Sequence, residues 1–139
     1  MAEETKGRLT TRTMAMPADT NPAGDVFGGW VLSQMDIAAG ICASQRAQQR
    51  AVTVSVDGMS FIQPVKVGDI LGVYTDVVEV GRTSMKIHVE AWVRRGQIGS
   101  REKVTEAIFK FVALDQDGNP TPVPDKNDLP EYAAEDCSL

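Results

Sequence analysis

The sequence predicts one α+β domain in which a curled, five-stranded antiparallel sheet wraps around a single long helix. Three observations lead to this prediction: one long segment with a helical period, strand-like segments before and after it, and short connections between the later strands. Short connections favour antiparallel neighbours, because parallel strands need a long crossover. A chain of 139 residues can bury a hydrophobic core of its own as one domain.

The chain begins with a predicted strand at residues 9–16, which alternate weakly and are rich in threonine. Residues 18–24 hold Asp, Asn, Pro and Gly and predict a loop. Asp25 stands where a helix N-cap belongs, so we expect it to cap the following helix. A catalytic role for Asp25 is the less favoured alternative.

The helix is predicted from about Val26 to Gln45. Its apolar residues recur at steps of three or four, the helical period: Phe27, Trp30, Val31, Met35, Ala38, Ile41 and Cys42. The opposite face is also small and uncharged, so we expect the helix to be buried on several sides. Asp36 is the only charged residue in this stretch. A buried carboxylate is costly unless it is paired, so Asp36 is either catalytic or tied up by hydrogen bonds in a subunit interface.

After the helix, residues 52–57 alternate strictly, and this strand is expected to continue past Gly58 to Phe61. Three more strands are predicted, at residues 70–80, 84–95 and 104–114. The last one is apolar on both faces at its centre, which is typical of an inner strand covered on both sides. Only one helix is available as a cover, so the second face is expected to meet another subunit.

The strand at 84–95 has one apolar face and one polar face, which carries Lys86, His88, Glu90, Trp92 and Arg94. We expect His88 to be exposed or at a rim. No metal site is predicted, because a single histidine and scattered acids form no ligand spacing.

Composition limits the possible partners. A net charge of −5 and a pI near 4.8 argue against nucleic-acid binding, which needs clustered Lys and Arg. No apolar run approaches the roughly 20 residues of a membrane span. Residues 1–8 are polar, lack a signal-peptide core and are expected to be flexible. Residues 124–139 are expected to form a loose tail, which leaves 9–123 as the domain.

The chain has two cysteines, one in the helix and one in the tail. A structural disulfide between Cys42 and Cys137 is therefore not expected, and the absence of a secretion signal favours the reducing cytoplasm. Cys42 is interpreted as a small core residue rather than a nucleophile.

Residues 21–30 form a polar, glycine-rich entry into the helix. A helix start with free backbone N–H groups favours developing negative charge. Combined with Asp36, this helix start suggests chemistry on a carbonyl group.

Three segments are similar to the hotdog-fold acyl-CoA thioesterases, and in particular to their broad-specificity bacterial branch. These segments are residues 16–30 with their Gly-Gly-Trp ending, Ser33-Gln34-Met35-Asp36, and Gly81-Arg82-Thr83-Ser84. The likeness covers roughly Arg12 to Val123. It implies a hotdog fold and hydrolysis of acyl-CoA to a carboxylic acid and coenzyme A, with no cofactor beyond the substrate's own coenzyme A.

The resemblance also implies catalytic roles. Asp36 corresponds to the catalytic base or nucleophile, and Gly28 to the oxyanion donor through its backbone N–H. Asn21 resembles the amide side chain that orients the thioester or the water. Thr53 sits where related enzymes place a hydroxyl near the attacking water.

Further residues are expected to contact the substrate. The turn at Gly81, Arg82, Thr83 and Ser84 resembles the one that meets the coenzyme A phosphates, and the planar fork of an arginine suits phosphate. Gly29 and Phe61 are also expected at the substrate. Phe61 and Trp30 could line an acyl pocket, although the interpretation of both as plain core residues is favoured.

Helix geometry separates two of these groups. Gly28 and Asp36 are eight residues apart, which corresponds to about 12 Å along one helix. Both must lie about 3 Å from the reacting atoms, so they must come from different protomers. The family implies the same arrangement, a two-fold homodimer with two interface sites. Further assembly is expected, as a trimer of dimers or a tetramer.

Two other functions are considered. A hotdog domain could bind and sense acyl-CoA without hydrolysing it, although binding alone needs no acid in the helix. A hydratase or dehydratase would need a histidine as its acid–base group, and His88 is the only one available.

Overall fold

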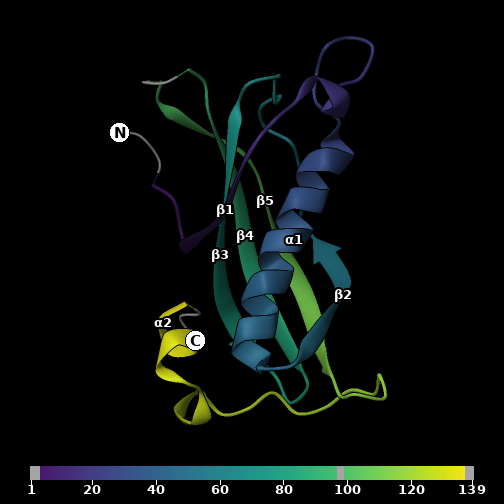
Figure 1. Ribbon diagram of the computed structural model, residues 1–139, viewed down its shortest axis with the longest axis vertical. Helices are drawn as coiled ribbons and strands as arrows, with labels where there is room; N and C mark the ends of the chain where they lie inside the picture. The colour runs from purple at the N-terminus through teal and green to yellow at the C-terminus, as the bar shows by residue number, and fades with distance from the viewer. Residues whose placement is uncertain (1–3, 97–98, 137–139) are drawn as a thin grey trace.

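The computed structural model describes residues 4–96 and 99–136. Its main elements are β1 (Arg8–Met14), α1 (Gly28–Ala47), β2 (Arg50–Asp57), β3 (Ile70–Val80), β4 (Ser84–Arg94) and β5 (Arg101–Leu114). The strands form one antiparallel sheet in the order β1-β3-β4-β5-β2, and α1 lies along one of its faces (Figure 1). This arrangement confirms the predicted hotdog fold.

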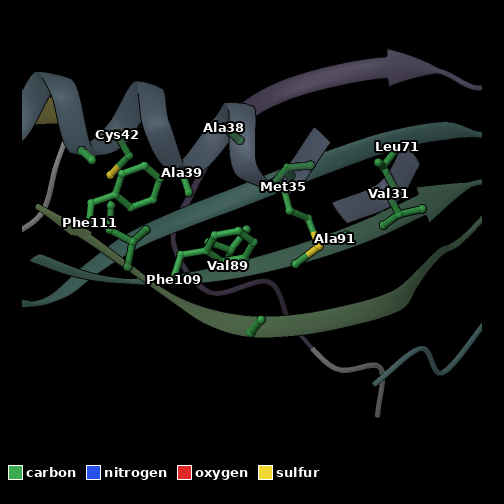
Figure 2. Packing of buried hydrophobic residues seen from close by; sticks show 14 of the residues in the cluster. Val31, Met35, Ala38, Ala39, Cys42, Leu71, Val89, Ala91, Phe109 and Phe111 are labelled. Atoms are coloured by element: carbon green, nitrogen blue, oxygen red, sulfur yellow. The ribbon is translucent and has the colours of Figure 1, made fainter. Parts of the chain in front are cut away.

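The core fills the space between α1 and the sheet. Met35, Ala38 and Cys42 of α1 are buried, and Cys42 lies beside the ring of Phe111 on β5 (Figure 2). Small helix residues let the helix approach the sheet closely. The predicted helical period and the interpretation of Cys42 as a core residue are confirmed.

The predicted cap of α1 is wrong. The helix begins at Gly28, and its N-cap is Phe27, which makes no side-chain capping hydrogen bond. Asp25 instead lies in a bridge with Lys66 and forms an ion pair with its ammonium group. Asp25 therefore pairs with Lys66, which is far away in sequence, and does not cap the helix that directly follows it.

The strand after the helix is shorter than predicted. β2 ends at Asp57, and Gly58 follows with a positive φ of 75°. The regular pairing with β5 stops there, although the Ile62 amide still donates to the Val104 carbonyl of β5 at 2.7 Å. Phe61 is exposed as a result, so the reading of Phe61 as a core residue is wrong for the single chain.

The sheet face opposite α1 is less exposed than the sequence predicts. Glu90 and Trp92 on this outer face are 0% and 4% exposed. The Lys6 amide and the Trp92 indole N–H both donate to Glu90 Oε1, at 2.9 and 3.0 Å. The N-terminal segment thus covers part of the face that alternation assigned to solvent.

The C-terminal residues are not a loose tail over the part that the structure describes. Arg46 of α1 donates to the Pro124 carbonyl at 2.7 Å, and Ala133 in the short helix α2 (Glu131–Asp136) is fully buried. Cys137 lies outside the described residues. Among the residues described, no helix combines the length and the apolar character needed to cross a membrane.

Candidate active site

Asp36 lies on a face of α1 that the sheet does not cover. The helix turns its small and apolar side to the core, which leaves Asp36 exposed in the single chain together with Leu32 and Ile37. The prediction of a helix buried on several sides is therefore wrong for one protomer. The Thr53 hydroxyl on β2 donates to Asp36 Oδ1 at 2.5 Å, so the structure brings these two predicted residues together.

An irregularity in β2 places Thr53. Thr53 pairs with Phe111 and Ser55 pairs with Lys110, so the register shifts at Val54. Such a bulge re-aims nearby side chains and is common beside active sites. Thr53 and Val54 are both exposed, and the hydroxyl of Thr53 reaches α1.

Asp36 and Thr53 belong to a pocket of about 380 Å³ between α1 and β2, which is also lined by Gly29, Leu32, Ser33, Val56 and Phe109. No lysine or arginine is among these lining residues. Within the described part of the chain, no cation forms an ion pair with Asp36. The carboxylate is oriented by a neutral donor and is not neutralised.

Gly28 lies in a different pocket. It opens α1 without a side-chain cap, so the first helical turn keeps backbone N–H groups for another acceptor. The surrounding pocket, also of about 380 Å³, is lined by Phe61, Ile62 and other residues of the loop after β2. A Cβ at Gly28 would lie 3.3 Å from the Phe61 ring. Glycine thus lets Phe61 sit against the helix start.

Asn21 holds the loop before α1. Its Oδ1 accepts from the amides of Ala23 and Asp25, at 3.0 and 3.1 Å. The side-chain nitrogen has no protein acceptor among the described residues, so it is the end of Asn21 that could meet a substrate.

The hairpin of Gly81, Arg82, Thr83 and Ser84 lies toward the Asp36 end of the sheet. Gly81 donates to the Ser84 carbonyl at 2.8 Å and closes the turn. Phe111 pairs with both Met85 and Thr53. Met85, which directly follows the hairpin, therefore lies two strand spacings, about 10 Å, from Thr53 across the sheet. Arg82 is exposed and its carbonyl accepts from the Val123 amide.

His88 is on the outer face of the sheet, away from both pockets. Its ring lies 2.9 Å from Glu106, and its side chain is 17% exposed rather than open at a rim. Pairing of β4 with β5 sets Glu90 opposite Glu106, and the ligand atoms of His88, Glu90 and Glu106 lie within 4.8 Å of one another. The expectation of scattered acids is therefore wrong.

A lysine already pairs with both acids of this cluster. Lys103 Nζ lies 2.9 Å from Glu106 and 3.4 Å from Glu90. The hydrogen bond from Lys103 lowers the pKa of Glu106 below its ordinary 4.5, against a smaller opposing effect of burial, and His88 adds to the lowering. These acids hold the outer face together.

Sequence reasoning missed several lining residues. Leu32 and Ser33 are four and three positions before Asp36, and helical spacing could have identified both as its neighbours. Ile62 carries no such signal, because it lies in a loop without periodicity.

Residues 23–100 match the model of the Thioesterase superfamily. The acyl-CoA thioester hydrolase YciA of Salmonella typhimurium is 52% identical over 122 residues, which cover 86% of this chain and 92% of that protein.

Two solved structures extend the likeness. A hexameric thioesterase from Yersinia pestis is 48% identical with a TM-score of 0.84, over 88% of this chain and 99% of that one. An acyl-CoA hydrolase from Staphylococcus aureus, solved with butyryl coenzyme A and coenzyme A, is 32% identical with a TM-score of 0.76, over 82% and 70%. Because the family model and these relatives each cover more than half of the chain, it belongs to the thioesterase superfamily, among the YciA-like acyl-CoA thioester hydrolases.

Proposed function

We propose that this chain hydrolyses the thioester bond of acyl-CoA and releases a carboxylic acid and coenzyme A. The observation that carries this proposal is the state of Asp36: a carboxylate in a pocket, oriented by the Thr53 hydroxyl and paired with no cation among the described residues. Such a group can accept a proton from water or attack a carbonyl carbon. The names of the relatives support acyl-CoA as the substrate.

The reaction that fits this geometry begins with water. Asp36 accepts a proton as the water oxygen attacks the thioester carbon, while Thr53 and Asn21 help to position the reactants. The carbonyl oxygen becomes anionic and accepts a hydrogen bond from the Gly28 N–H at the positive end of α1. The carbon–sulfur bond then breaks, and coenzyme A leaves as a thiolate that recovers the proton.

Direct attack by Asp36 is the alternative first step. It would form an anhydride between the acyl group and the carboxylate, which water then hydrolyses. A single turnover in ¹⁸O-labelled water separates the two routes, because only the anhydride route can leave the label on Asp36.

The working site requires two protomers. Asp36 and Gly28 line different pockets of one chain and are separated by about 12 Å along α1. We propose that a two-fold dimer brings Asp36 of one protomer to Gly28 of its partner. The contact surface would be the open side of α1 and the neighbouring edge strand β2, which expose these apolar residues: Leu32, Ile37, Ile41, Val54 and Val56.

Several solved relatives are hexamers, which supports an assembly larger than a dimer. We propose a trimer of such dimers for this chain. On this proposal Asp36 is exposed in one protomer and enclosed in the assembly, where its attraction to developing positive charge is less screened by water.

The decisive experiment is a panel of coenzyme A esters from acetyl to palmitoyl, with release of free thiol as the signal. We expect saturable hydrolysis that depends on chain length. Tight binding of coenzyme A without thiol release would indicate a sensing domain instead. Hydration of an enoyl-CoA would indicate a hydratase, which the position of His88 on the outer face does not favour.

A further inference from the structure

The outer face of the sheet carries a third pocket, which the proposed hydrolysis does not use. It has a volume of about 190 Å³ and is lined by Arg12, Arg94 and Arg101, together with apolar and aromatic residues and Gly72. No acidic residue is among its lining residues. Three guanidinium groups around one hollow are unexpected in a chain with a net charge of −5.

Two of these arginines face each other directly. Arg94 on β4 is the cross-strand partner of Arg101 on β5. Like charges at opposed positions of a sheet destabilise it. A bound anion would remove this repulsion, and within the described chain no carboxylate does so.

The neighbouring Arg95 has a structural role, because carboxylates satisfy its guanidinium group. Arg95 donates to Asp69 at 3.1 Å and to Glu102 at 3.4 Å. Arg12, Arg94 and Arg101 make no such ion pair among the described residues. Arg101 is nevertheless oriented, because it donates to the Tyr74 hydroxyl at 2.7 Å and keeps its remaining N–H groups for another acceptor.

Gly72 keeps the pocket open. It lies inside β3, between Arg12 on β1 and Trp92 on β4. A Cβ at this position would lie 3.2 Å from Leu9 and 3.7 Å from Tyr74 and would reduce the space. Glycine within a strand often marks a place where a ligand approaches the backbone.

We propose that this pocket binds a phosphate group, either as free inorganic phosphate or as the phosphate of a nucleotide. Arginine forks match phosphate oxygens in pairs, and three of them more than offset the charge of a doubly charged anion. The pocket is smaller than the roughly 300 Å³ at which pockets begin to enclose a whole drug-sized ligand, so a nucleotide would place only its phosphate inside.

The site is separate from the proposed coenzyme A contact. Arg94 is the last residue of β4, and Arg82 lies just before its first residue, Ser84. The length of β4, about 34 Å, therefore separates the two arginines. Phosphate binding here therefore does not depend on the hydrolysis proposed above, and the two can fail independently.

The test is titration of the intact oligomer, at low salt and without phosphate in the buffer, with inorganic phosphate, adenosine monophosphate or adenosine. Calorimetry should show saturable binding of the two phosphates and none of adenosine. The thermal midpoint should rise by about 2–4 °C at saturation. Tighter binding of adenosine monophosphate would identify a nucleotide phosphate, and equal binding would identify phosphate itself.

Variants locate the binding. Arg94→Gln and Arg101→Gln should each weaken phosphate binding at least about tenfold, which is the loss of one charge-assisted contact. The exposed Arg50→Gln should leave it unchanged. Absence of saturable binding to the wild type would overturn the proposal, and so would binding that persists in both pocket variants. Dissociation of the oligomer in these variants would also overturn it, because the arginines would then serve a contact between copies.

Discussion

Asp36 and Glu90 are both carboxylates next to the same sheet, but their surroundings are opposite. Asp36 lies on the helix side, exposed, with one hydrogen bond from a neutral hydroxyl. Glu90 lies on the outer face, fully buried, with donors from Lys6 and Trp92 and the ammonium of Lys103 at 3.4 Å. One acid has no cationic partner among the described residues, and the other is buried beside a lysine.

This difference separates function from stability. An acid that lacks a cation can gain or lose a proton during a reaction, because no ion pair has to be broken first. An acid enclosed with a lysine contributes to folding, because removal of either partner leaves a buried charge unpaired. Burial alone would have selected Glu90, and only the partners of each acid make Asp36 the candidate for the proposed reaction.

The largest expected effect is on turnover when Asp36 is changed. Asp36→Asn should lower kcat on the order of 10²–10⁴-fold, because the amide can neither take a proton nor attack. Thermal stability and oligomer size should stay at wild-type values. The exposed Asp57→Asn is the matched control and should keep full activity. A near-normal kcat for Asp36→Asn would remove this residue from the reaction.

The next effect concerns Gly28, whose amide we propose to oppose Asp36 across the dimer. Gly28→Pro removes the N–H donor at the first helical position, where proline is well tolerated, and should lower kcat on the order of 10²–10³-fold. Phe27 already has the extended backbone that a following proline requires, with φ −59° and ψ 138°.

Gly28→Ala is the control for this variant. It adds a Cβ near the Phe61 ring but keeps the N–H, so it isolates the steric effect. We expect most of the activity to remain. Equal losses in Gly28→Pro and Gly28→Ala would show that packing, and not the donor, matters at this position.

Glu90 should show the reverse pattern. Glu90→Gln removes the buried charge that Lys103 faces and should cost about 3 kcal/mol of unfolding free energy, the lower end for a broken buried pair because Glu106 still pairs with Lys103. Denaturant unfolding measures this loss. The folded variant should retain its kcat. A large loss of kcat with unchanged stability would erase the distinction between the two acids.

The proposed coenzyme A contact should give a smaller effect. Arg82→Ala is expected to raise KM for coenzyme A esters roughly fivefold with little change in kcat, since an exposed ion pair contributes about 1 kcal/mol. The exposed Arg50→Ala serves as the control. A KM that stays constant in Arg82→Ala would exclude this arginine from the phosphate contacts.

The smallest effect is the pH dependence of Glu106. Lys103 and His88 lower its pKa in the folded state, so its contribution to stability is complete above the ordinary value of 4.5. That contribution is lost as the pH falls below 4.5 and through the lowered pKa. The difference in thermal midpoint between the wild type and Glu106→Gln should therefore shrink in this range. A difference in thermal midpoint that stays constant from neutral pH to below pH 4.5 would contradict the lowered pKa of Glu106.

The fold could be predicted from the sequence because period and turn residues are local signals. β3 has the predicted bounds, and the register of the sheet turns the predicted apolar face of β4 toward α1. The errors share a cause, which is contact with residues far away in sequence. Asp25 pairs with Lys66 instead of capping the helix. On the outer face of β4, contacts with Lys6 and Lys103 accompany the burial of Glu90, which alternation had assigned to solvent.

The candidate site could be predicted only in part. The isolated acid in an apolar helix pointed to Asp36, and the family resemblance added Thr53, which the structure places at hydrogen-bond distance. The bulge that positions Thr53 depends on the register with β5 and leaves no local signal in the sequence. The arginine pocket was missed for the same reason, because strand pairing and not sequence spacing sets Arg94 opposite Arg101.

The most direct test asks whether two chains complete one site, with subunits that carry Asp36→Ala mixed with subunits that carry Gly28→Pro. Each variant alone should be nearly inactive. Random two-fold dimers of the mixture would contain one intact site in every mixed dimer, so activity should return to about a quarter of wild type. A mixture that stays as inactive as its two components would show that acid and amide act within a single chain.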